Sequence, residues 1–137
     1  MIGKRYYEPE WDGVFNNIDP AHDDVDRFSM GLRYLGTNEE EISELKDPTT
    51  TDVRAVLTQW NKQASQIAKL ADPYKCLYVV YYSGHGVTGK NAKQYLVLEK
   101  DSLICIDELV RGISRFSHCY VLVIYDACRN TLNEKVW

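Results

Sequence analysis

Two uninterrupted apolar segments stand out in the pattern of hydrophobic and polar positions along this chain. One runs from Cys76 to Tyr82 and the other from Cys119 to Tyr125. Neither alternates between apolar and polar residues as a strand with one face in water does, so each is typical of a strand buried on both faces. Amphipathic segments surround and separate them. This order predicts an α/β fold with a mostly parallel sheet and helices on both faces.

Apolar residues at helical spacing predict three helices. Their expected ranges are 20–35, 50–70 and 106–116. Asp19 and Pro20 mark the start of the first helix, and Gly36 marks its end. Thr50 or Thr51 is expected to cap the second.

Shorter segments predict the remaining strands and the limits of the domain. Residues 94–99 alternate like a strand, and residues 41–45 could form a short edge strand. Residues 1–3 resemble the tail of a first strand, whereas nothing after Cys128 resembles a further strand. We therefore expect a single domain over residues 1–137 that is truncated at both ends.

Composition and charge exclude several functional classes. A chain of 137 residues with 45% apolar residues can form one domain with a real core, and it is not generally disordered. The net charge is −4 and no basic block occurs, so neither nucleic acid nor an anionic membrane is an expected partner. No apolar stretch reaches the roughly 18 residues of a spanning helix. The N-terminus also lacks the apolar core of a signal peptide.

Cysteine usage predicts a reducing compartment. The four cysteines are Cys76, Cys105, Cys119 and Cys128. They form no CxxC pair, and three of them lie in or beside apolar segments, where a free cysteine packs as a small hydrophobe. We therefore expect the protein in the cytoplasm. The cysteines and the three histidines show no metal-ligand spacing, so no metal site is expected.

His85 and Cys128 are the candidate reactive residues. Each follows one of the two buried strands, and side chains at the carboxyl ends of neighbouring parallel strands meet in one crevice. A cysteine and a histidine brought together in this way can act as nucleophile and base. Each also has a plain structural interpretation, His85 as a loop residue and Cys128 as a buried strand end. The glycines on both sides of His85 favour function, because they let backbone approach a substrate closely.

A second motif overlaps the histidine and must be weighed. Residues 84–90 satisfy the pattern G-x-G-x-x-G and nearly match a phosphate-binding loop. Position 91 is Asn, so the hydroxyl that would bind magnesium is missing. Residues 94–99, which follow, alternate like a strand, whereas a phosphate loop opens a helix. The sequence therefore argues against nucleotide binding.

The two boxes together resemble the caspase, metacaspase and paracaspase superfamily. Residues 81–86 (Tyr-Tyr-Ser-Gly-His-Gly) are similar to its histidine box, and residues 126–130 (Asp-Ala-Cys-Arg-Asn) to its cysteine box. The resemblance covers nearly the whole chain but only the large-subunit region of the family. It implies a three-layer caspase-like fold whose C-terminal part is missing. A C-terminal small-subunit segment or a second chain would then complete the sheet and the substrate pocket.

The resemblance also implies an activity and roles for particular residues. It implies a cysteine endopeptidase that acts on polypeptides and needs no cofactor. Cys128 would be the nucleophile and His85 the general base and acid. The N–H groups of Cys128 and Gly86 would form the oxyanion hole.

Asp126 separates this chain from true caspases. Caspases hold a P1 aspartate with Gln two residues before the cysteine and with an arginine before the first helix. Here Asp126 takes the first position, and residues 16–23 contain no arginine. Asp126 is similar to the acidic residue of metacaspases and paracaspases, which prefer P1 Arg or Lys.

Asp24 lies where paracaspases carry a second pocket carboxylate, in an alignment that could slip to Asp23 or Asp26. From the residues alone, this acidic cluster is equally typical of a solvated helix start. Two hypotheses therefore remain: a cysteine endopeptidase with basic P1 preference, and an inactive or incomplete caspase-like interaction module.

Overall fold

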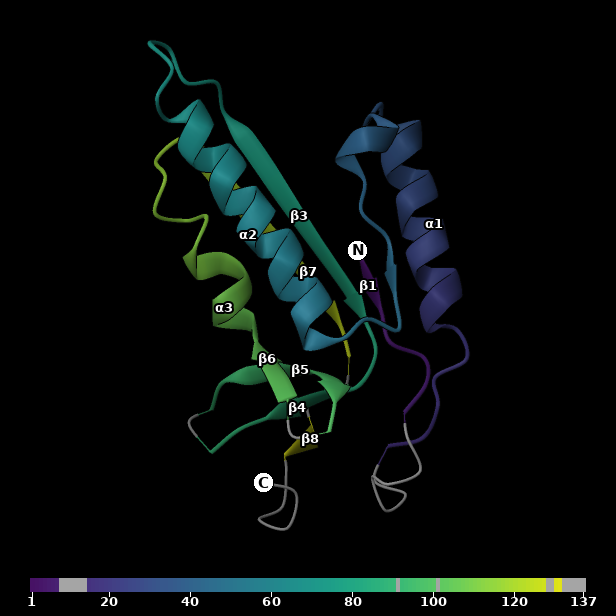
Figure 1. Ribbon diagram of the computed structural model, residues 1–137. Coiled ribbons are helices and arrows are strands. Elements are labelled where there is room, and N and C mark those ends of the chain that lie inside the picture. Colours follow the sequence, from purple (N-terminus) through teal and green to yellow (C-terminus); the bar gives the residue numbers. More distant parts are fainter. Residues whose placement is uncertain (8–14, 91, 101, 128–129, 132–137) are drawn as a thin grey trace.

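The computed structural model describes residues 1–7, 15–90, 92–100, 102–127 and 130–131, and it contains both strands and helices (Figure 1). In chain order they are β1 (Ile2–Gly3), α1 (Ala21–Tyr34), the 3₁₀ helix η2 (Glu39–Glu41), β2 (Leu45–Lys46), α2 (Thr50–Ile67), β3 (Cys76–Ser83), β4 (Gly86–Thr88), β5 (Gln94–Glu99), β6 (Ser102–Cys105), α3 (Ile106–Arg111), β7 (Cys119–Asp126) and β8 (Asn130–Thr131).

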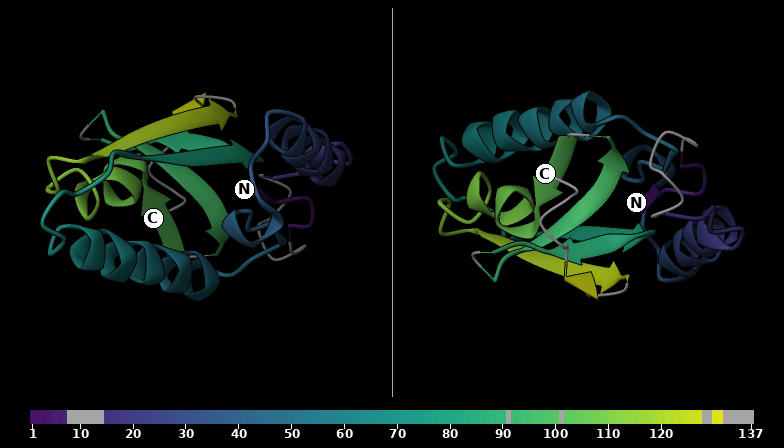
Figure 2. Two further views of the ribbon diagram at one scale, coloured as in Figure 1. Left: turned by 90° about the horizontal axis from the view of Figure 1, so that it is seen from above. Right: turned by 90° about the horizontal axis from the view of Figure 1, so that it is seen from below.

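A four-stranded parallel sheet forms the centre of the fold, with strand order β2-β1-β3-β7. Figures 1 and 2 together show α1 and α2 on either side of β3. Successive residues of β3 alternate between the two helices, because side chains of a strand point to opposite faces. Tyr81 stacks on Phe28 of α1 at 4.4 Å between ring centroids. Tyr82 instead joins the buried core that includes Val53 of α2. The predicted α/β fold with a mostly parallel, helix-flanked sheet is therefore confirmed.

A second, smaller sheet lies at the carboxyl end of β3, with strand order β6-β5-β4-β8 (Figure 1). Its pairs are antiparallel except for β4 with β8. Only β5 was predicted from the sequence. The expectation that no strand follows Cys128 was wrong, because Asn130–Thr131 pairs with Val87 and Thr88.

The helix boundaries differ from the predicted ones at their caps. Thr49, rather than Thr50 or Thr51, caps α2: its hydroxyl accepts from the Asp52 N–H at 3.1 Å, and Asp52 accepts from the Thr49 N–H at 2.8 Å. Thr50 is instead held by Glu99, which accepts from its N–H at 2.6 Å.

Two further predicted ranges were too broad. The strand expected at residues 41–45 is reduced to Leu45–Lys46, because residues 39–41 form a 3₁₀ turn. The third helix ends at Arg111 rather than at residue 116.

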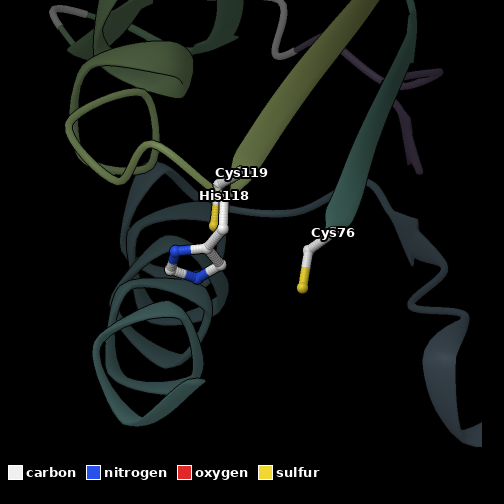
Figure 3. Close-up of side chains that lie close together, drawn as sticks. All are labelled: Cys76, His118 and Cys119. Carbon is white, nitrogen blue, oxygen red and sulfur yellow. The ribbon is translucent and has the colours of Figure 1, made fainter. Parts of the chain in front are cut away.

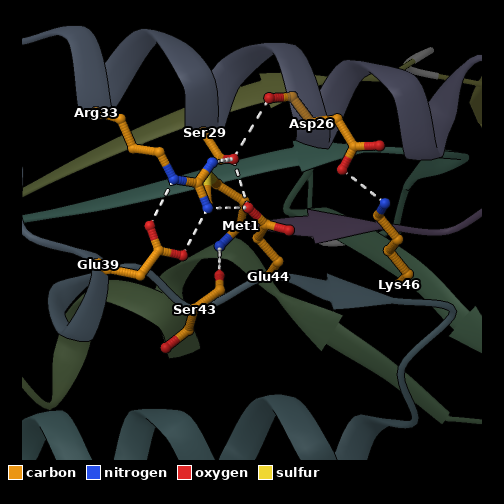
Figure 4. Close-up of polar contacts among 8 residues, drawn as sticks. All are labelled: Met1, Asp26, Ser29, Arg33, Glu39, Ser43, Glu44 and Lys46. Atoms are coloured by element: carbon orange, nitrogen blue, oxygen red, sulfur yellow. Dashed lines mark hydrogen bonds and ion pairs between the residues drawn. The ribbon is translucent and has the colours of Figure 1, made fainter.

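Helix α1 is tied to the sheet by close packing and by an ion-pair network. A Cβ on Gly3 would lie 2.7 Å from the Ala21 carbonyl oxygen, so only glycine lets α1 approach β1 this closely. Figure 4 shows Arg33 at the far end of the helix, with Nε and Nη2 donating to the Glu39 carboxylate at 2.6 and 2.7 Å. Arg33 also reaches Glu44 at 3.0 Å, which connects α1 to the segment that leads into β2.

The outward face of β7 exposes apolar side chains. Tyr120 and Leu122 are 52% and 47% exposed, and Leu77 on neighbouring β3 is 63% exposed. Among the described residues, β7 pairs with β3 alone and forms one edge of the sheet. Within the same residues, no helix is long and apolar enough to cross a membrane.

Candidate active site

The carboxyl ends of β3 and β7 bring the candidate residues to one edge of the sheet. The two strands are parallel and in register, with Ser83 opposite Asp126. His85 therefore follows β3 at the level where β7 ends. Cys128 follows Asp126 by two residues in the sequence, but it lies outside the described residues.

Two tyrosine hydroxyls hold the backbone of His85. The hydroxyl of Tyr7 accepts from the His85 N–H at 2.8 Å, and the hydroxyl of Tyr82 donates to the His85 carbonyl at 2.6 Å. The same carbonyl accepts from the Val97 N–H at 3.1 Å. A Cβ on Gly84 would lie 2.4 Å from the Tyr82 hydroxyl oxygen and 3.0 Å from that of Tyr7, so this arrangement requires a glycine before the histidine.

The imidazole of His85 is oriented by a backbone carbonyl and two aromatic rings. Its Nε2 lies 2.7 Å from the carbonyl oxygen of Asn16. A carbonyl can only accept, so Nε2 carries the proton and the lone pair of the neutral ring is on Nδ1. The rings of Tyr7 and Phe15 contact the imidazole at centroid distances of 4.6 and 4.9 Å. This tautomer leaves Nδ1 able to act as a base.

Gly86 directs its N–H away from β5. His85 and Val97 make one ladder bond, from the Val97 N–H to the His85 carbonyl, because the His85 N–H donates to Tyr7 instead. The next pair, Gly86 with Leu96, is then a non-hydrogen-bonded pair whose N–H groups face outward. The Gly86 N–H thus faces the side of β4 on which β8 lies.

Asp24 and Asp126 come together around the end of β3. Asp24 accepts from the Ser83 hydroxyl at 2.9 Å, and Asp126 accepts from the Tyr81 hydroxyl at 3.4 Å. Burial raises the pKa of Tyr81 to about 12, and the negative charges of Asp24 and Asp126 contribute to the increase. Tyr81 therefore remains a neutral donor between two carboxylates.

The neighbouring acids do not take part in this arrangement. Asp26 pairs with Lys46 at 2.6 Å (Figure 4), and Asp23 is exposed on α1. Of the three alternatives open from the sequence, Asp24 is the one that accepts from Ser83, the register partner of Asp126. Two carboxylates that contact neighbouring hydroxyls can bind a cationic group.

Comparison with known proteins identifies the family. The model of the caspase domain matches residues 1–136. The chain belongs to the caspase-domain family. The predicted membership of the caspase-like superfamily is thereby confirmed, and this family is one of cysteine peptidases. A search of curated proteins finds no match to the chain.

The caspase domain also contains a second group of cysteines and histidine that sequence spacing did not reveal. Cys76, His118 and Cys119 each offer a ligand atom, and these atoms lie within 4.8 Å of one another (Figure 3). The group stands at the amino ends of β3 and β7. Seven residue steps of about 3.3 Å put it some 23 Å along β3 from Ser83. It is therefore too far away to act together with His85.

Sequence reasoning missed this second group because Cys76 lies 42 residues before His118. Only the parallel pairing of the two strands brings them together. The one signal available was a cysteine at the start of each apolar segment.

Proposed function

We propose that this caspase domain is a cysteine endopeptidase in which Cys128 is the nucleophile and His85 the general base and acid. Nδ1 of His85 takes the thiol proton, and the thiolate attacks the scissile carbonyl. The N–H groups of Cys128 and Gly86 stabilise the oxyanion, at roughly 3 kcal/mol per donor. The imidazolium then protonates the leaving amine, and water hydrolyses the acyl-enzyme. The Nε2 contact with Asn16 supports the role of His85, because it fixes the tautomer that the first step needs.

We further propose that the enzyme prefers arginine or lysine at P1, as metacaspases and paracaspases do. A single observation carries this proposal: Asp24 and Asp126, on different elements, converge on the hydroxyls of Ser83 and Tyr81. A guanidinium presents a fork of donors that suits two carboxylates, whereas an aspartate side chain would meet like charge.

The test is hydrolysis of matched peptides that carry Arg, Lys or Asp at P1. Peptides with Arg or Lys should be cleaved, and Cys128→Ala should abolish cleavage. Asp126→Asn should lower kcat/KM for the Arg peptide about 10–100-fold, the loss expected for one charged hydrogen bond. Asp72→Asn, an exposed acid at the other end of the fold, is the matched control. Preference for Asp at P1 would contradict the pocket assignment, and cleavage by the Cys128→Ala variant would contradict the nucleophile.

The partner we propose, besides the polypeptide substrate, is a C-terminal small-subunit segment or a second chain that pairs with β7. The apolar side chains of Leu77, Tyr120 and Leu122 support it, since they are exposed beside an unpaired strand edge of the described sheet. The same surface supports the alternative function, an inactive interaction module. Adding a C-terminal small-subunit segment to the chain distinguishes the enzyme from the interaction module, because an enzyme should gain peptidase activity while a module should gain only stability.

We propose the cytoplasm as the compartment. Of the four cysteines, Cys76, Cys105 and Cys119 are free thiols within the described residues, and they support a reducing environment.

A further inference from the structure

Three potential metal ligands meet at the amino ends of β3 and β7. Cys76 begins β3, Cys119 begins β7, and the two are direct partners in the parallel register. His118 precedes Cys119, and the ligand atoms of all three lie within 4.8 Å of one another (Figure 3). We propose that Cys76, His118 and Cys119 form a binding site for a thiophilic divalent cation, Zn²⁺.

The state of the histidine points to a missing ligand. The side chain of His118 is among the buried ones, with 9% of its surface exposed. Its Nε2 is buried and has no hydrogen-bond partner among the described residues. An unpaired buried nitrogen costs about 1–3 kcal/mol, and an N–Zn bond would replace that cost with a favourable contact.

The distances suit a tetrahedral ion. Zn–S bonds of about 2.3 Å and Zn–N bonds of about 2.0 Å put ligand atoms roughly 3.5–3.8 Å apart. The observed separations of at most 4.8 Å therefore need to close by at most about 1.3 Å, which side-chain rotation can supply.

Hydrogen bonds hold the backbone of the cysteine ligands in place, so the site is largely formed before an ion binds. The Cys76 N–H donates to the His118 carbonyl at 2.9 Å, and the Cys119 N–H donates to the Phe116 carbonyl at 3.0 Å. The imidazole of His118 also contacts the Phe116 ring, with 5.9 Å between centroids. Little ordering entropy is left to lose when the ion binds.

Charge balance favours Zn²⁺ over harder ions. Two thiolates and a neutral imidazole bring a charge of −2, which one divalent cation cancels, so the buried complex is neutral. Binding releases the two thiol protons to solvent. Ca²⁺ and Mg²⁺ prefer oxygen ligands, which this set lacks.

A surface hollow lies beside the histidine of the site. His118 lines it together with Lys75 and Arg115. A water molecule can enter from this side and complete the tetrahedron. The ion would then join the start of β3 to the start of β7.

The test is Zn²⁺ titration of the full chain under reducing conditions, with Cys128→Ala as the common background so that the reactive thiol binds no metal. We expect one Zn²⁺ per chain with a dissociation constant of roughly 1 μM or tighter. Two protons should be released per ion, and the thermal midpoint should rise with Zn²⁺ concentration. Co²⁺ in place of Zn²⁺ should give a thiolate charge-transfer band and visible bands of a tetrahedral site.

Substitution of each ligand separates this site from other binding. Cys76→Ser, Cys119→Ser and His118→Ala should each weaken Zn²⁺ binding by more than the 10–100-fold typical of outer-shell changes. Cys105→Ser, a free cysteine outside the group, is the matched control and should bind like the background protein.

Three results would overturn the proposal. They are tight binding that survives all three ligand substitutions, the absence of Zn²⁺ binding by the folded background protein, and a Cys76–Cys119 disulfide that forms in a glutathione buffer in preference to the zinc complex. The second and third need no substituted protein, so they decide the question even if a ligand variant fails to fold.

Discussion

The hydroxyl of Tyr7 gives the sharpest test of how the fold positions its histidine. Tyr7 is 7% exposed, and its hydroxyl is the acceptor for the part-buried His85 N–H at 2.8 Å. Tyr7→Phe keeps the ring that contacts the imidazole and removes only the oxygen. The carbonyl of His85 keeps its bonds from Tyr82 and Val97, so at His85 the substitution removes only the acceptor of the N–H group.

The expected cost follows from that one lost acceptor. A buried N–H left without a partner costs about 1–3 kcal/mol of the free energy of unfolding. For 137 residues, an unfolding entropy of about 2.1 cal/mol/K per residue converts each kcal/mol into about 3–4 °C of melting temperature. Tyr7→Phe should therefore lower Tm by roughly 3–10 °C.

Thermal melting and amide hydrogen exchange measure this effect. The His85 amide should exchange faster in the Tyr7→Phe variant, while amides in the middle of β3 keep their protection. Tyr6→Phe is the matched control, since Tyr6 is adjacent and 54% exposed. Equal melting temperatures for the two variants would refute the claim that the Tyr7 hydroxyl supports His85.

Other consequences can be checked on the same protein. Burial raises the pKa of Tyr7 to about 12, so the hydroxyl loses its proton at a lower pH in the unfolded chain than in the folded one. The free energy of unfolding should therefore fall as pH rises from about 10 towards 12. In alkaline denaturation, Tyr7→Phe should flatten that part of the curve of stability against pH. Leu96→Ala in the core should cost about 2–5 kcal/mol in urea unfolding, whereas Leu70→Ala at a half-exposed site should cost under about 0.5. Leu122→Lys should reduce self-association in sedimentation without lowering Tm, whereas the same change at inward-facing Val123 should unfold the domain.

The sequence predicts the long elements of this fold and misses the short ones for a physical reason. Strands β3 and β7 are long uninterrupted apolar segments, and helices α1 and α2 have apolar residues at helical spacing, so these four elements are visible in the residues alone. Strand β4 is three residues long and β8 is two, and such segments are strands only because they pair with other parts of the chain. Residues 39–41 form a 3₁₀ turn because Asn38 and Glu41 make a local capping box.

Some residues of the candidate site could likewise be predicted from the sequence, and others could not. His85, Asp126 and Asp24 were readable from motifs, and the structure gives each a hydrogen-bond partner at one end of the sheet. The roles of the Tyr7 and Tyr82 hydroxyls could not be predicted from the sequence, because the contact between Tyr7 and His85 spans 78 residues of sequence. A tyrosine in an apolar run gives no sign of which backbone group its hydroxyl will meet.

The register of β7 against β3 determines what lies at both ends of the sheet. It sets Ser83 opposite Asp126 at the carboxyl end and Cys76 opposite Cys119 at the amino end. Because β7 is apolar throughout, alternation alone cannot fix this register. Tyr125 can fix it, since its hydroxyl donates to the Tyr95 carbonyl at 3.0 Å and its ring stacks with Tyr82. A slip of one residue would move Asp126 to the opposite face from Asp24 and separate the two cysteines. The proposed acidic pocket and the proposed zinc site thus depend on one shared register, so a substitution that shifts β7 should impair both.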